Sequence, residues 1–458
     1  MRRAEEQREE KYLRMTTAPL YPLLWQMAVP SMVGMAVASV YSMTDTFFVG
    51  KLDRTELTAA VGIVFSFISI IQAIGFWFGY GSGNALSRHA GEKNFDRAEE
   101  MAAAGFDLAV LVGVLIAVLG LVWMRPLAAL LGAGTSTAVF TAVLSYLRIT
   151  LIGVPLMLVS NVLYNQLRLQ GSGRDSMLGL LAGMVLNMAL DPVLILGLHM
   201  EVAGAALASL IGQACGVAIL WRQTARNGNI PVRPLRWKPK LSLVGAILAG
   251  GAPNFCRQGI SSVSAVILNH AAGAFGEAVL AGLTVALRVL SMGYALVIGF
   301  GQGFQPICLI NYGAGRHRRI KKAFLCALGT ATGFLILGNA VMGFGSRGIA
   351  AAFSTDDAVI RAASDFLRAF STVLPFMGYY ILIGMLMQNI GRFGQATLIT
   401  TMENGLFLIP LALALPPVFG YPGLLWCKPA ASLCALLCSL LIGTRAWRRY
   451  LKEEQGGA

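Results

Sequence analysis

Long apolar stretches alternate with short polar connections along the whole chain. Each stretch is bounded by charged residues or by glycine and proline clusters, and most exceed the roughly 20 residues that a helix needs to cross a bilayer. The pattern predicts an all-α integral membrane protein with twelve transmembrane helices. The expected spans lie near 20–49, 57–87, 98–124, 137–169, 176–198, 202–221, 242–273, 278–312, 323–345, 358–390, 396–418 and 423–444.

The composition supports this prediction. Hydrophobic residues make up 56% of the chain and charged residues 13%, about half the charged share of soluble proteins. So little polar surface cannot solvate a globule of 458 residues. The composition therefore excludes a soluble enzyme, a disordered chain and nucleic-acid binding as the main role.

The basic residues explain the net charge of +14 without a nucleic-acid partner. They collect in the connections on one side of the predicted spans, most densely in the polar connection 222–240, whereas the opposite connections carry few. Lysine and arginine mark the loops that stay in the cytoplasm, where they also meet anionic lipids. Both termini are therefore expected in the cytoplasm, and membrane lipids are expected partners.

The two halves of the chain resemble each other. The connection 222–240 separates six predicted spans from six, and each half has the same direction of entry into the membrane. Residues that match between the halves are Pro30 with Pro253, Phe78-Gly79 with Phe300-Gly301, Gly81 with Gly303, Gly91 with Gly313, and Gly173-Arg174 with Gly391-Arg392.

This repeat predicts two six-helix lobes related by a pseudo-two-fold axis along the membrane normal, with a cavity between them. The expected organisation is an N-terminal tail at 1–19, an N-lobe at 20–221, a linker at 222–241, a C-lobe at 242–444 and a C-terminal tail at 445–458.

The halves differ in their buried acids. Asp45 and Asp191 lie in apolar spans of the first half, where the repeat partners are Leu268 and Ile409. A carboxylate inside a membrane costs at least a few kcal/mol, so an ionisable residue there is a functional candidate. We therefore expect a cation or proton site in the first half.

Neighbouring oxygen groups extend this candidate site. Asn187 is four residues before Asp191, which places both on one helix face, and Ser209 lies on the next span. Together with Asp45 they form an all-oxygen set suited to Na⁺, whereas two close carboxylates are also able to share a proton. Both H⁺ and Na⁺ are candidate coupling ions, and a purely structural polar network is the alternative.

A second group of residues is expected at the substrate cavity. It comprises Tyr41 in the first span, Asn161, Tyr164 and Asn165 in the fourth, Arg257 in the seventh and Glu403 in the eleventh. For Arg257 and Glu403, a buried ion pair that neutralises both is the competing interpretation. The asparagines have their own alternative, which is hydrogen bonding between helices.

The chain resembles the multidrug and toxic compound extrusion (MATE) family, particularly its MepA-like and DinF-like bacterial branch. The residues that carry the resemblance are Pro30 with Thr44–Leu52, Asn187 with Leu190-Asp191-Pro192, Val202–Ala206, Gln305-Pro306 and Asn311–Ala314. The resemblance implies two helical lobes and export driven by a Na⁺ or H⁺ gradient. It also implies that Asp45, Asn187, Asp191 and Ser209 form the cation site of the N-lobe. Glu403 departs from the family pattern, which usually has arginine there, and adds a negative group that attracts cations.

We therefore expect a secondary antiporter in a bacterial cytoplasmic membrane that exports amphipathic, cationic, drug-like compounds in exchange for H⁺ or Na⁺. It is expected to be a monomer without an organic cofactor and not an enzyme. One alternative is a lipid-linked oligosaccharide flippase, which needs a broadly basic cavity, whereas only Arg257 and Arg288 offer charge at depth. The other is a membrane enzyme built on the glycine-flanked Ser82, which lacks a neighbouring base.

Overall fold

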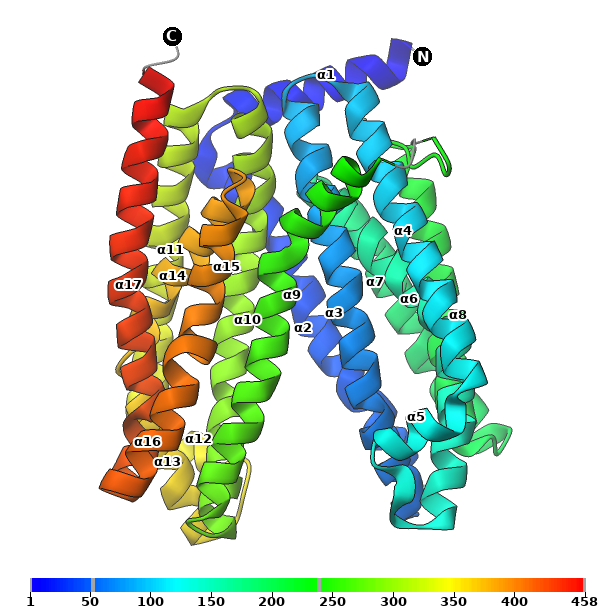
Figure 1. Ribbon diagram of the computed structural model, residues 1–458, viewed down its shortest axis with the longest axis vertical. Coiled ribbons are helices and arrows are strands. Elements are labelled where there is room, and N and C mark those ends of the chain that lie inside the picture. The colour runs from blue at the N-terminus through cyan, green and yellow to red at the C-terminus, as the bar shows by residue number, and fades with distance from the viewer. Residues whose placement is uncertain (1, 51–53, 237–239, 456–458) are drawn as a thin grey trace. The chain divides into compact units, whose positions relative to one another are not determined.

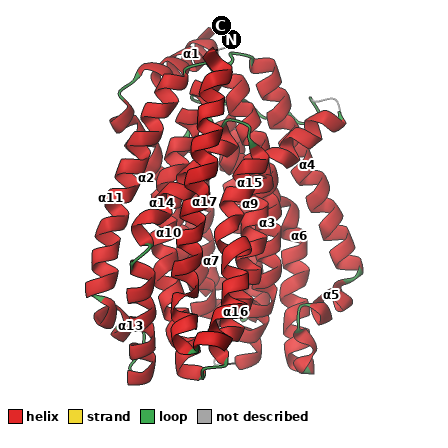
Figure 2. Cartoon of the chain, turned by 60° about the vertical axis from the view of Figure 1, so that its left-hand side comes forward, coloured by secondary structure: helices red, strands yellow, loops and turns green. Residues whose placement is uncertain are grey.

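The computed structural model describes the backbone of residues 2–50, 54–236 and 240–455, and within them all side chains except those at 2–4, 38–48, 50, 135 and 448–455. Helices make up nearly all of this part of the chain, and no strand occurs in it (Figure 2). Ten of the described helices are long and apolar enough to span a membrane, and one bent pair raises the number to eleven. The prediction of an all-α, multi-span protein is confirmed.

The remaining predicted span, 242–273, is also a helix. It forms α9 (Leu241–Gly273), which is long enough to cross a bilayer but is not among the ten apolar spans. Asn254, Arg257 and Gln258 follow one another closely in its middle, and these polar side chains lower its hydropathy.

The bent pair replaces what the sequence predicts as one continuous span at 358–390. Helices α13 (Asp357–Ser371) and α14 (Leu374–Asn389) meet at an angle of 56°. Pro375 stands in the first turn of α14. It has no N–H to bond back across the junction, and it disfavours helical backbone in the residue before it. The chain therefore bends where the sequence places this proline.

The chain folds into two compact units, which share the helices α2, α9 and α10 along their lengths. Unit 1 comprises Met1–Pro19, Gln26–Gly251 and Leu309–His317. Its elements are α1 (Arg2–Thr17), most of α2 (Leu20–Gly50), α3 (Thr55–Gly91), α4 (Phe95–Val122), α5 (Met124–Leu130), η1 (Ala133–Thr135), α6 (Thr137–Leu169), α7 (Gly173–Asp191), η2 (Pro192–Gly197), α8 (Glu201–Thr224), the start of α9 and the end of α10.

The core of unit 1 is built around α6. This helix packs against α3, α4 and α8, and it is the most deeply buried of the candidate spans. Glycine allows the close approach, since a methyl group on Gly79 of α3 would lie 2.9 Å from the carbonyl oxygen of Asn161 in α6. Small residues drive such packing in membranes, where apolar burial alone gives no advantage over lipid.

Unit 2 comprises Leu20–Trp25, Ala252–Cys308 and Arg318–Ala458. In it α14 packs against α15 and α17, and the π-helical η3 packs against α17. Unit 2 contains the start of α2, the rest of α9, all of α10 (Glu277–Gly313) except its end, and α11 (His317–Phe344) from Arg318 onward. Its other elements are α12 (Ser346–Ala351), α13, α14, α15 (Phe393–Thr401), η3 (Met402–Leu408), α16 (Ile409–Phe419) and α17 (Tyr421–Gln455). Figure 1 labels most of these helices along the chain.

Candidate functional site

The predicted cation site begins with a contact between α7 and α8 in unit 1. Four glycines make this contact, two on each helix, and on each helix they are four residues apart: Gly179, Gly183, Gly212 and Gly216. A methyl group on Gly212 would lie 2.5 Å from the carbonyl oxygen of Gly183, and one on Gly183 would lie 2.7 Å from that of Gly212. Only glycine permits backbones to approach this closely.

One helical turn further on, this contact brings two of the predicted residues together. Asn187 Nδ2 donates a hydrogen bond of 3.1 Å to Ser209 Oγ. Asn187 is buried, and its Oδ1 atom accepts no hydrogen bond from the residues that the structure describes. The pair therefore offers a buried amide oxygen that a cation is able to use.

Asp191 is the last residue of α7 and is 0% exposed. The π-helical η2 follows directly, beginning at Pro192. Because proline lacks an N–H, the regular hydrogen bonding of an α-helix breaks there, and short π-helical stretches are frequent at functional sites. Helix α8 packs closely on η2, since a methyl group on Gly204 would lie 2.9 Å from the carbonyl oxygen of Leu194.

The side chains of Asp45 and Tyr41 lie outside the described residues, although the backbone there belongs to α2. The preceding part of α2 runs beside α7. A methyl group on Gly173 would lie 3.5 Å from the carbonyl oxygen of Met27, and one on Gly34 would lie 3.6 Å from the Leu180 side chain. The same offset in residue number separates the facing residues of α2 and α7 at both contacts, so the register of the two helices is constant over this length.

The candidate cavity residues of α6 make most of their bonds along their own helix. Asn161 Nδ2 donates to the Met157 carbonyl oxygen, at 2.9 Å, and Asn165 Nδ2 donates to that of Asn161, at 2.8 Å. Asn165 is fully buried and also accepts a hydrogen bond of 3.0 Å from Arg168. The Tyr164 hydroxyl would lie 3.8 Å from a methyl group on Gly34 of α2.

Glu403 in unit 2 is the centre of a second buried polar cluster. Its Oε1 atom accepts from Lys428 Nζ at 3.2 Å and from Ser432 Oγ at 2.8 Å, while Oε2 accepts from the Tyr294 hydroxyl. Glu403 and Lys428 are both nearly inaccessible to solvent. The Tyr294 hydroxyl in turn lies 2.9 Å from that of Tyr380.

This cluster replaces the alternative interpretation in which Glu403 forms an ion pair with Arg257. Within the described part of the chain the ion-pair partner of Glu403 is Lys428. Arg257 is half-buried on α9 and within electrostatic range of Tyr294. The sequence contained the signal, because Lys428 stands inside the apolar run of 423–444, directly before Pro429.

Two further residues from the sequence serve structural roles. Ser82 Oγ donates to the Phe78 carbonyl oxygen at 2.7 Å and accepts from Gln166 Nε2 at 3.0 Å. Asp107 in α4 accepts a hydrogen bond of 2.8 Å from the backbone N–H of Leu235, which fastens the connection after α8 to α4.

The described residues contain no group of three or more histidine, cysteine, aspartate or glutamate side chains able to hold a metal ion. The described oxygen groups near the α7–α8 contact are the Asp191 carboxylate, the Asn187 amide and the Ser209 hydroxyl.

The family comparison decides what kind of protein carries these features. The sequence model of the MatE family matches the chain twice, at residues 30–193 and 253–413, and so covers well over half of it. The chain belongs to the MatE family. The two matches begin at Pro30 and Pro253, which confirms the internal repeat. As a MATE family transporter it is a multi-pass membrane protein and not an enzyme.

Individual relatives agree with this assignment over almost the full length. The Multidrug export protein MepA of Staphylococcus aureus (strain MRSA252) is 24% identical over 439 residues, covering 95% of this chain and 96% of the relative. A crystal structure of a MATE protein in the bent conformation matches with a TM-score of 0.89 at 22% identity, covering 97% of this chain and 99% of that one.

A MOP superfamily transporter from Pyrococcus furiosus matches with a TM-score of 0.85 at 22% identity, covering 95% of this chain and 97% of the other. The two solved structures show that this MATE transporter has their fold.

Proposed function

We propose that this transporter exports amphipathic, drug-like organic compounds, with a preference for cations, in exchange for H⁺ or Na⁺. The name of the MepA relative, a multidrug export protein, supports the substrate class. The membrane of residence is then the bacterial cytoplasmic membrane, with both termini in the cytoplasm, and the two repeats act as lobes on either side of the substrate path.

The observation that carries this proposal is the fully buried Asp191, one helical turn from Asn187, which is hydrogen-bonded to Ser209 of α8. A charged carboxylate at membrane depth costs at least about 2.5 kcal/mol. The repeat partner Ile409 avoids that cost. Reversible binding of a cation or proton at Asp191 explains why the first half keeps a buried carboxylate despite this cost.

Asp45 joins the same site in our proposal because of the register between α2 and α7. Gly34 is near Leu180, and Met27 is near Gly173. A continuous α2 that keeps this register brings residue 45 level with residue 191, and residue 41 level with residue 187. Two carboxylates at one level attract a cation more strongly than either alone, or share a proton.

The coupling follows from competition for this charge. Binding of H⁺ or Na⁺ neutralises the carboxylates and favours one arrangement of α2, α7 and α8, and a cationic substrate is displaced from it. H⁺ or Na⁺ shifts the transporter between two conformations only if the ion binds one of them more tightly than the other. Glu403 does not contribute to the cation preference, because Lys428 already balances its charge.

Flux across proteoliposomes tests the proposal. The assay follows efflux of a fluorescent organic cation while the pH and the Na⁺ gradients are collapsed one at a time. We expect Asp191→Asn to abolish gradient-driven efflux while the protein remains folded. Asp107→Asn, which alters an acid of α4 away from the site, is the matched control. Undiminished coupled efflux by Asp191→Asn would disprove the assignment of the site.

A further inference from the structure

The helix α1 presents its charges in an unusual way for the basic side of a membrane protein. It runs across the ends of α3 and α4 (Figure 1). Glu5, Glu6 and Glu10 are exposed to solvent, whereas Arg8 and Lys11 are turned toward the body of unit 1. A helix that binds anionic lipid would show the reverse arrangement. Arg8 and Lys11 therefore make their contacts within the protein.

Lys11 holds two connections at once. Its Nζ atom donates to Ser172 Oγ at 2.7 Å, in the turn between α6 and α7, and to Asn229 Oδ1 at 2.6 Å, in the connection after α8. Asn229 Nδ2 donates in turn to Asp175 at 3.1 Å. Ser172, Asn229 and Asp175 are all buried, so α1 completes a polar network that water does not reach freely.

The other side of α1 is fastened to α4 and to the turn before it. Arg8 is 3.3 Å from Glu99, which also accepts a hydrogen bond from Arg236 of the connection. Lys93, in the turn between α3 and α4, donates to Glu9 at 2.8 Å. The same ammonium group lies 4.6 Å from the ring centre of Tyr12.

The C-terminal end of α1 is bound by α10, a helix of the second repeat. Asn311 Nδ2 donates to the Met15 carbonyl oxygen at 3.0 Å, and an Arg316 guanidinium N–H donates to that of Thr16 at 2.8 Å. The last carbonyl groups of a helix have no partner within it. Asn311 at the end of α10 and Arg316 in the turn that follows it supply these partners.

Beneath α1, the ends of α3 and α10 meet at a pair of glycines. A methyl group on Gly91 would lie 2.4 Å from the Ile310 carbonyl oxygen, and one on Gly313 would lie 2.1 Å from that of Arg88. The Arg88 guanidinium is also 5.3 Å from the ring centre of Tyr312. The two helices therefore touch backbone to backbone.

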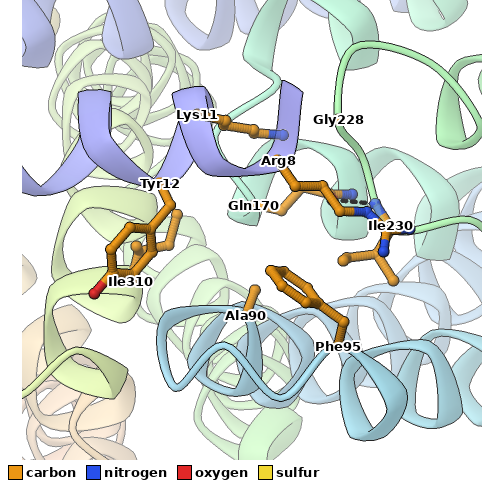
Figure 3. A pocket seen from close by; sticks show the side chains of 9 residues that line it. All are labelled: Arg8, Lys11, Tyr12, Ala90, Phe95, Gln170, Gly228, Ile230 and Ile310. Atoms are coloured by element: carbon orange, nitrogen blue, oxygen red, sulfur yellow. Dashed lines mark hydrogen bonds between the residues drawn. The ribbon is translucent and has the colours of Figure 1, made fainter. Parts of the chain in front are cut away.

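Helix α1 covers this contact without filling the space above it. A cavity of about 30 Å³ lies between them. Figure 3 shows Arg8 and Lys11 of α1 on one side of this cavity, with Ala90 and Phe95 on the other. The attachment of α1 depends on hydrogen bonds and ion pairs, which water replaces at small net cost.

We propose that α1 is a latch that holds the ends of α3 and α10 together and must let go before they separate. Helix α1 is attached to Lys93 beside the end of α3, and to Asn311 at the end of α10 and Arg316 just after it, so separation breaks one of these attachments. The inference rests on the proposed function, because only a transporter that opens at this end needs such a release.

Hydrogen–deuterium exchange of the full chain in nanodiscs tests the latch. Lys11→Met removes the central attachment, and Lys93→Gln, at an exposed position, removes one at the edge. We expect amides of residues 88–93 and 309–316 to exchange about tenfold faster in Lys11→Met, and about two- to fivefold faster in Lys93→Gln, whose ion pair is exposed. Glu6→Gln, on the exposed face of the same helix, is expected to match the wild type.

The outcome against the latch is faster exchange in α1 alone, with residues 88–93 and 309–316 unchanged, or no change anywhere. Faster exchange throughout α6 shows that the Lys11→Met variant is misfolded. The exchange of residues 88–93 and 309–316 in Lys93→Gln then decides for or against the latch. The exchange measurement needs neither substrate nor gradient, so it tests the latch even if the flux assay rejects cation-coupled export.

Discussion

Two of the buried carboxylates in the described part of the chain, Asp191 and Glu403, have different surroundings. Glu403 has an ammonium group at 3.2 Å and accepts hydrogen bonds from Ser432 and Tyr294. Asp191 stands at the junction of α7 with a π-helical stretch, one helical turn from Asn187. The first arrangement is a structural ion pair, and in our proposal the second is the place where a cation binds and leaves.

The ion pair leads to a stability prediction. Glu403→Gln leaves the Lys428 ammonium group buried without a counter-charge, which we expect to lower the free energy of unfolding by about 3–5 kcal/mol. Adding Lys428→Met to Glu403→Gln should restore most of that loss, since no charge then remains buried. Thermal unfolding of the two single variants and the double variant measures this coupling. Losses that simply add would show that the two side chains do not interact.

Lys11 leads to a pH prediction. Burial lowers its pKa from 10.5 to about 7, although the facing Asp175 opposes this and Arg14 and Arg8 reinforce it. Docked α1 therefore binds this proton less readily than released α1 between pH 7 and 10.5. Docking should weaken by about 1.4 kcal/mol for each pH unit as the pH falls toward 7, and should not change further below 7.

The difference in melting temperature between wild type and Lys11→Met, followed from pH 6 to pH 9, isolates this effect. The variant is uncharged at every pH, so other titrating groups cancel in the difference. A constant difference over this range would mean that Lys11 keeps its proton when docked.

At the scale of helices, the close approach of α7 and α8 is what assembles the candidate site. It depends on glycines spaced four apart and facing each other, and on Gly204 against the π-helical η2. The hydrogen bond between Asn187 and Ser209 exists only because these backbones are in contact. The site is therefore a product of helix packing as much as of its polar residues.

Gly212→Ala tests this dependence. The added methyl group would lie 2.5 Å from the Gly183 carbonyl oxygen, so the helices must move apart. We expect a loss of about 1–3 kcal/mol in stability and a loss of coupled efflux. Gly62→Ala in α3 is the control, because a methyl group there meets no atom within 4 Å. Equal behaviour of the two variants would contradict this packing role.

The sequence predicts the helices well and their irregularities poorly. A long apolar stretch predicts a membrane-spanning helix, because a single segment in lipid satisfies its backbone hydrogen bonds only as a helix. Pro375 marks the place of the bend in the sequence, but the angle of 56° and the π-helical stretches depend on the packing of neighbouring helices, which a single sequence does not contain. Lys428 is the opposite case, since it was visible in the sequence but its partner depended on the packing of α17 against η3.

At the scale of the whole molecule, the distribution of basic residues predicts the topology. The connection 222–240 and both termini are expected in the cytoplasm, and the turn between α12 and α13 outside. In a background without the seven native cysteines, a membrane-impermeant thiol reagent added to intact cells should label Thr355→Cys but not Arg226→Cys. Both positions are exposed. The reverse labelling pattern would invert the transport direction that we propose.

The contact between Gly91 and Gly313 has a consequence for how the chain tolerates mutation. The two positions correspond to each other in the repeat, and each touches the backbone around the other. Had the halves been separate identical chains, one substitution would have altered both sides of this contact together. In a single polypeptide the two glycines mutate independently. Substitution of either one is enough to force the two backbones apart, so selection must act on each glycine separately.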